Sequence, residues 1–124
     1  MESTKPAIRR MKTYTGGQGY VYQYYFVGKR AGKTTTSGAA TEYIFDVTSD
    51  RKTTFAVSVF MPEESVRRWA AKHGRTLTDA EQYGAVKMHL FHAFDEIENM
   101  MTDGRQLLAN PDSLEQVLAT LGVE

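Results

Sequence analysis

The stretch TTFAVSVFMPEESV, residues 53–66, contains the change of pattern that decides the fold. In its first half Phe55, Val57 and Val59 alternate with small residues, which is the period of a strand with one buried face. Pro62 then suits the first position of a helix, and the two glutamates after it complement the positive end of the helix dipole. The sequence therefore predicts a strand that passes directly into a helix.

Before this point the chain has the composition of a β-sheet. Residues 20–27 and 43–47 are rich in aromatic and β-branched side chains, and the short polar link at residues 49–52 predicts a hairpin to the strand that follows it. A weaker strand at residues 11–14 is placed to pair with the first across a glycine cluster. Residues 28–41, rich in Gly, Thr, Ser and Ala, are interpreted as a mobile hairpin tip.

After this point the period becomes helical. Residues 62–73 form the first predicted helix, and Gly74 ends it. Thr78 and Glu81 have the spacing of a capping box, and they begin a long helix predicted over residues 79–102. A leucine-rich stripe with i, i+3, i+4, i+7 spacing predicts a terminal helix from Asp112 to Leu121.

Strands followed by helices favour an α+β fold over alternating βαβ units. We expect a three- to four-stranded antiparallel sheet over residues 11–60, with two or three helices packed on one face. Residues 1–10 are predicted to form a basic, flexible arm, and residues 11–124 a single domain, since 124 residues is an ordinary length for one core. The predicted core includes Phe55, Val57, Val59, Trp69, Leu90, Phe94 and Ile97.

The composition excludes several kinds of chemistry. There are no cysteines, so disulfides, thiolate metal sites and cysteine nucleophiles are excluded. The chain has no formal net charge, but residues 1–60 hold nine bases and four acids, while residues 61–124 hold six bases and eleven acids. No apolar run approaches the roughly 20 residues of a membrane helix. We therefore expect a cytoplasmic protein without a membrane partner.

Two motifs have the residue types for chemistry but lack part of the required pattern. GKRAGKT, residues 28–34, has three residues between its glycines where a phosphate-binding loop has four, and no helical pattern follows it. His89, His92 and Glu96 have a spacing that can place three metal ligands on one helical face. That face is predicted to point into solvent, away from the apolar stripe, so we predict no metal, no cofactor and no catalytic residue.

The long predicted helix supports a protein-binding hypothesis. Met88 and Phe91 lie on a second side of this helix, away from its main apolar stripe. Leu114 and Leu118 of the terminal helix either cover that side or join it in an interface. The sequence thus favours a small non-catalytic binding or regulatory module that contacts another protein, or a second copy of itself as a homodimer.

Nucleic-acid binding is the alternative hypothesis. Tyr20, Tyr22 and Tyr24 alternate onto one face of a strand, where exposed rings would stack on bases. The basic side chains available to neutralise phosphates are Arg9, Arg10, Lys12, Lys29, Arg30 and Lys33. The sequence decides neither the partner nor which face of this strand is open.

Overall fold

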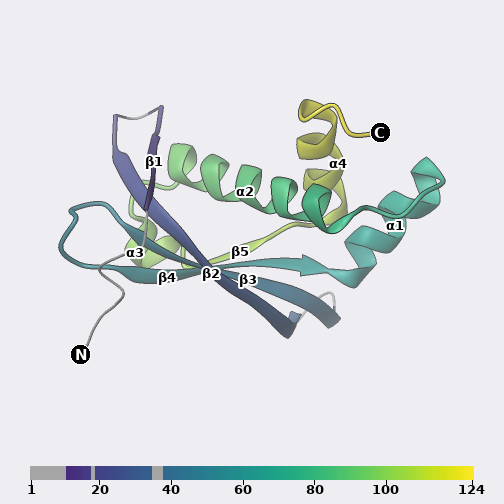
Figure 1. The fold of residues 1–124 in the computed structure, drawn as a ribbon, viewed down its shortest axis with the longest axis horizontal. Helices are drawn as coiled ribbons and strands as arrows, with labels where there is room; N and C mark the ends of the chain where they lie inside the picture. Colours follow the sequence, from purple (N-terminus) through teal and green to yellow (C-terminus); the bar gives the residue numbers. More distant parts are fainter. Residues whose placement is uncertain (1–10, 18, 35–37) are drawn as a thin grey trace.

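The computed structural model describes residues 11–17, 19–34 and 38–124, so the predicted arm, with Arg9 and Arg10, lies outside the described residues. The described chain has an α+β fold with a curled five-stranded sheet in the order β1-β2-β3-β4-β5 (Figure 1). The strands are β1 (Lys12–Thr15), β2 (Val21–Thr34), β3 (Gly38–Thr48), β4 (Phe55–Pro62) and β5 (Gln106–Leu108). The helices are α1 (Glu63–His73), α2 (Asp79–Glu96), α3 (Met100–Asp103) and α4 (Pro111–Thr120).

The first four strands form an antiparallel meander, as predicted. The hairpin between β3 and β4 is held by Asp50, which accepts hydrogen bonds from the backbone N–H groups of Lys52 and Thr53, while Arg51 takes a left-handed conformation. The prediction of an all-antiparallel sheet of three or four strands is wrong, because β5 pairs with β4 in parallel. A strand of three residues carries too little alternation to be recognised in the sequence.

Residues 28–41 do not form the predicted mobile tip where they are described. β2 and β3 pair continuously from Gln23 opposite Thr48 to Thr34 opposite Gly38, with one irregularity between Phe26 and Gly28. Residues 35–37 lie outside the described residues. The small residues of this segment are therefore tolerated inside a long hairpin, because backbone hydrogen bonds form whatever the side chains are.

The helices agree with the prediction except at one end. α1 ends at Gly74 in the left-handed conformation, and Thr78 and Glu81 make both hydrogen bonds of the predicted capping box. The long helix, however, ends at Glu96 and not near residue 102. The Asn99 side chain accepts a hydrogen bond from the N–H of Thr102 and begins α3 as a separate turn.

One face of the sheet and the helices enclose the core. Figure 1 shows α2 and α4 on the same side of the sheet. Of the predicted core residues, Ile97 is only partly buried, because α2 has ended before it. The other six are buried, namely Phe55, Val57, Val59, Trp69, Leu90 and Phe94. Among the described residues, no helix is both long and apolar enough to span a membrane.

Candidate functional site

Three lysines from three elements lie along a row of contacting aromatic rings, with Lys12 and Lys87 beside Tyr83 and Lys29 over Tyr43. Lys12 of β1 lies opposite Tyr24 and Lys29 of β2 lies opposite Tyr43, and both tyrosines are buried in the core. Directly opposed residues of antiparallel strands project to the same face, so both lysines lie on the side of the sheet that α2 covers. The third lysine, Lys87, comes from α2.

The rings between these lysines are in contact with one another. The Lys87 Nζ lies 5.5 Å from the ring centroid of Tyr83, and the Lys29 Nζ lies 5.7 Å from that of Tyr43. The Tyr83 ring is 5.0 Å from that of Phe26 and 6.4 Å from that of Tyr43. We call Lys12, Lys29 and Lys87, with the half-buried rings of Phe26 and Tyr83, the lysine–tyrosine patch.

The electrostatics of this patch are those of a site with excess positive charge. Within the described part of the chain, none of the three lysines forms an ion pair. Burial lowers the pKa of Lys87, and electrostatic repulsion from the nearby Lys12 ammonium group lowers it further. Burial and then the charge of Asp79 raise the pKa of Tyr43, so an acid lies within electrostatic reach of the patch at its Tyr43 end.

A small crevice opens within the patch. Its volume is about 140 Å³, and its walls are Lys12, Tyr24, Tyr25, Phe26 and Tyr83. This is less than the roughly 300–1,000 Å³ of a pocket that encloses a whole drug-sized molecule. The crevice therefore has room for one planar group of a larger partner, with the rest of that partner lying outside on the lysines.

The structure brings together only part of the predicted nucleic-acid surface. Lys12 and Lys29 belong to the patch, and Lys33 is exposed further along β2. Arg30 instead lies opposite Glu42, and its Nε donates to the Glu42 Oε1 at 2.8 Å.

The predicted face of Tyr20, Tyr22 and Tyr24 is not available to bases. Tyr20 is exposed, but Tyr22 and Tyr24 are buried under α2, and the Tyr22 ring stacks on Phe94 at 4.3 Å between centroids. These rings serve the core because their face of the strand is the one that α2 covers. The sequence showed which residues share a face but not which face is covered.

Tyr83 and Lys87 were not among the site residues that the sequence predicted. These residues lie one helical turn apart on α2, but nothing in their spacing predicted that α2 would pass beside Lys12 and Lys29. The only available signal was the i, i+4 pairing of an aromatic ring with a lysine.

The predicted protein interface is occupied by the chain itself. Leu114 and Leu118 are fully buried, and the Phe91 ring stacks on that of Tyr14 at a centroid distance of 4.5 Å and an angle of 4°. Met88 is partly buried against the same core. The sequence offered the terminal helix as the cover of Met88 and Phe91, but Phe91 packs against Tyr14 of β1 and Tyr24 of β2 instead. Leu114 and Leu118 are in the core, so these four residues do not form one free surface.

The predicted metal ligands do not converge. The His89 Nδ1–H donates to the carbonyl oxygen of Ala85 at 2.8 Å, and the Nε2 lies 2.8 Å from the Ser113 hydroxyl on α4. Both ring nitrogens are therefore occupied, whereas His92 and Glu96 are exposed. Among the described residues, no group of three or more His, Cys, Asp or Glu side chains is placed to hold a metal.

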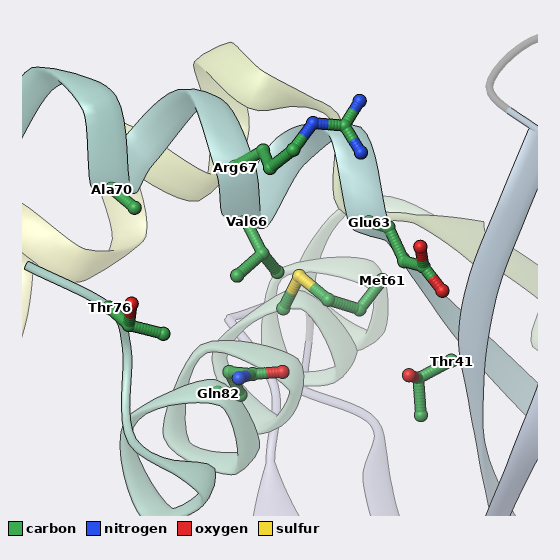
Figure 2. Close-up of a pocket in the computed structure, with 8 residues that line it drawn as sticks. All are labelled: Thr41, Met61, Glu63, Val66, Arg67, Ala70, Thr76 and Gln82. Atoms are coloured by element: carbon green, nitrogen blue, oxygen red, sulfur yellow. The ribbon is translucent and has the colours of Figure 1, made fainter.

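A larger cavity lies at the other end of the core, between α1 and α2. Its volume is about 350 Å³, and Figure 2 shows Met61 and Val66 meeting at its centre, with Gln82 and Thr41 on the side opposite α1. Glu63 and Arg67 bring opposite charges to its rim. The lining contains no histidine, serine or cysteine, and its hydroxyl groups are those of Thr41 and Thr76.

No protein-family model, curated protein or solved structure matches this chain.

Proposed function

We propose that this protein is a small non-catalytic binding module that takes an anionic partner at the lysine–tyrosine patch. The observation that carries the proposal is that Lys12, Lys29 and Lys87, from three elements, flank one row of contacting rings, and that none of them has an ion-pair partner among the described residues. Like charges held together repel, and an anion bound between them removes that repulsion.

The charge distribution of the chain supports this placement. Two of the three lysines come from residues 1–60, where bases outnumber acids, although the whole chain is neutral. A local positive surface on a neutral protein attracts anions at short range, within about a Debye length of 8–10 Å at physiological salt. The predicted binding is therefore confined to the patch.

Salt-dependent binding of an oligonucleotide tests the proposal. The probe is a fluorescent single-stranded oligothymidylate, followed by anisotropy from low to high salt. We expect the triple variant Lys12→Gln, Lys29→Gln, Lys87→Gln to lose at least tenfold in affinity at low salt. We also expect its salt slope to fall by about 2, because each phosphate contact on a single strand contributes about 0.7.

The matched control removes the same charge elsewhere. Lys52, Arg68 and Lys72 are exposed and lie outside the patch, so their triple replacement by Gln should leave the slope nearly unchanged. An equal loss in both triple variants would show a diffuse charge effect and overturn the assignment of the patch.

Homodimer formation is a second candidate, favoured by a different surface. The face of the sheet opposite the core carries Ile44 and Phe60, both half-buried, and Leu108, which is 39% exposed. Arg30 and Glu42 add both signs of charge to the same face. A surface with apolar residues and both charges can complement itself, so we propose a second copy of this chain as its partner.

A further inference from the structure

We infer that the anionic partner of the lysine–tyrosine patch is a single-stranded nucleic acid, which inserts one unpaired base into the crevice beside Tyr83. This inference rests on the proposed function and specifies its ligand. It is drawn from the shape and chemistry of the crevice, which the lysines alone do not explain.

The walls of the crevice suit a flat aromatic group. Of its lining residues, Phe26 and Tyr83 have half-buried rings on the core side of the sheet, and these two rings meet at an angle of 58°. Because their centroids are 5.0 Å apart, the two rings touch and form an angled wall, and a flat base laid on the face of one ring meets the edge of the other. The volume of the crevice, about 140 Å³, admits one flat base.

The lysines lie where the backbone of such a strand would pass. Lys12 forms part of the crevice wall, and Lys87 lies over the Tyr83 ring. Lys29 continues the positive charge along β2, over the Tyr43 ring. Aromatic rings flanked by cations are the arrangement by which proteins hold single strands, because every base has a stacking face and every nucleotide a phosphate.

The crevice discriminates between partners of similar charge. In a duplex the bases are stacked on one another and cannot enter it without being unpaired, so a duplex would engage the lysines alone. An acidic peptide would also meet the lysines, but its carboxylates would leave the aromatic walls unfilled. A single-stranded nucleic acid is therefore the partner that contacts both the lysines and the aromatic rings of the patch.

The experiment compares four probes on the unmodified full chain. These are a single-stranded oligothymidylate, an oligomer of the same length with abasic sugars, a blunt duplex of the same length, and a peptide of glutamates. Anisotropy at fixed low salt gives each affinity. We expect the oligothymidylate to bind about tenfold or more tightly than the abasic oligomer, because base–aromatic stacking is lost in the latter.

A variant adds an independent readout. Tyr83→Leu keeps an apolar side chain on α2 but removes the ring, and we expect it to bring the oligothymidylate affinity down to that of the abasic oligomer. The abasic oligomer should bind Tyr83→Leu and the unmodified chain equally. Circular dichroism shows whether this variant is folded, and the abasic comparison needs no variant.

The outcomes distinguish anion binding at the patch from insertion of a base into the crevice. If the lysine triple variant weakens binding but the abasic oligomer, duplex or peptide binds as tightly as the oligothymidylate, the patch binds anions and the base inference is wrong. If the lysine variant changes the affinity for none of the probes, the proposed function itself fails. Tighter binding of the oligothymidylate, lost in Tyr83→Leu, supports both.

Discussion

His89 is a partly buried histidine, and both of its ring nitrogens have hydrogen-bond partners. Its Nδ1–H donates to the Ala85 carbonyl, so in the neutral ring the Nε2 accepts from the Ser113 hydroxyl. Burial is the largest cause that lowers the pKa of His89, and the charge of nearby His92 adds to the effect. The structure therefore favours the neutral imidazole.

Because the pKa of His89 is lowered in the folded state, we expect the protein to lose stability in mild acid. Because the folded-state pKa lies below the ordinary value of about 6.5, the unfolded chain takes up a proton first as the pH falls. The free energy of unfolding should therefore decrease from pH 7 to pH 5, and less steeply in His89→Gln. Urea unfolding at both pH values measures this.

His92→Gln is the control for this prediction. His92 is exposed on the same helix, so its replacement should leave most of the pH dependence in place. If His89→Gln keeps the full pH dependence while His92→Gln removes it, the buried ring is not its source.

At the scale of the element, the capping box of α2 holds the helix that supplies Tyr83 and Lys87. The Thr78 Oγ1 accepts from the Glu81 N–H at 3.1 Å, and the Glu81 Oε1 accepts from the Thr78 N–H at 2.9 Å. Arg75 donates two hydrogen bonds to the same carboxylate, and it is the first cause that lowers the pKa of Glu81 to about 2. Glu81 is thus ionised throughout the neutral range.

We expect Thr78→Ala to lower the free energy of unfolding by about 1 kcal/mol at pH 7, because an N-terminal N–H of α2 loses its acceptor. Urea denaturation measures the change. Thr76→Ala, at an exposed position just before the helix, is the matched control and should have little effect. Equal losses in the two variants would mean that the cap contributes nothing specific.

The end of α2 shows the limit of a periodic pattern at this scale. Helical spacing continues beyond Glu96, yet the backbone at Ile97 is extended and Met101 is 44% exposed. Asn99 offers the chain a new cap, and Met100 is buried after the break. Side-chain spacing alone does not register a local cap that competes with helix continuation.

At the scale of the whole molecule, the sheet face opposite the core is the surface that we propose for self-association. The Ser58 hydroxyl donates to the Glu42 Oε2 at 2.6 Å, and Arg30 holds the other oxygen of that carboxylate. The hydrogen bond from Arg30 and then that from Ser58 lower the pKa of Glu42. The Arg30, Glu42 and Ser58 side chains thus form a polar cluster beside the apolar side chains of Ile44 and Phe60.

If this face forms a homodimer, Leu108→Asp should convert the dimer into a monomer. A charge buried in an apolar contact is left without water or a partner. Light scattering after size-exclusion chromatography measures the molar mass. Leu121→Asp, at an exposed position just after α4, is the control and should stay dimeric. A monomer in the unmodified chain would exclude this surface as a self-interface.

The local features of this protein were predictable because short stretches determine them. The four-strand meander, the β3–β4 hairpin, the capping box at Thr78 and the Gly74 helix end all depend on residues close in sequence. Lys12 and Lys29 were also among the predicted anion-binding residues. Their environment was not predictable.

Only the tertiary structure decided which faces are covered. Burial of Tyr22 and Tyr24, the pairing of β5 with β4, and the meeting of Lys87 with Lys12 all join residues far apart along the chain. Periodicity places side chains on a common face, but the burial of that face depends on the helix that packs against it. The sequence by itself therefore determined the longer elements and their amphipathic faces, though not β5 or the break between α2 and α3, while the packing of α2 on the sheet determined the patch.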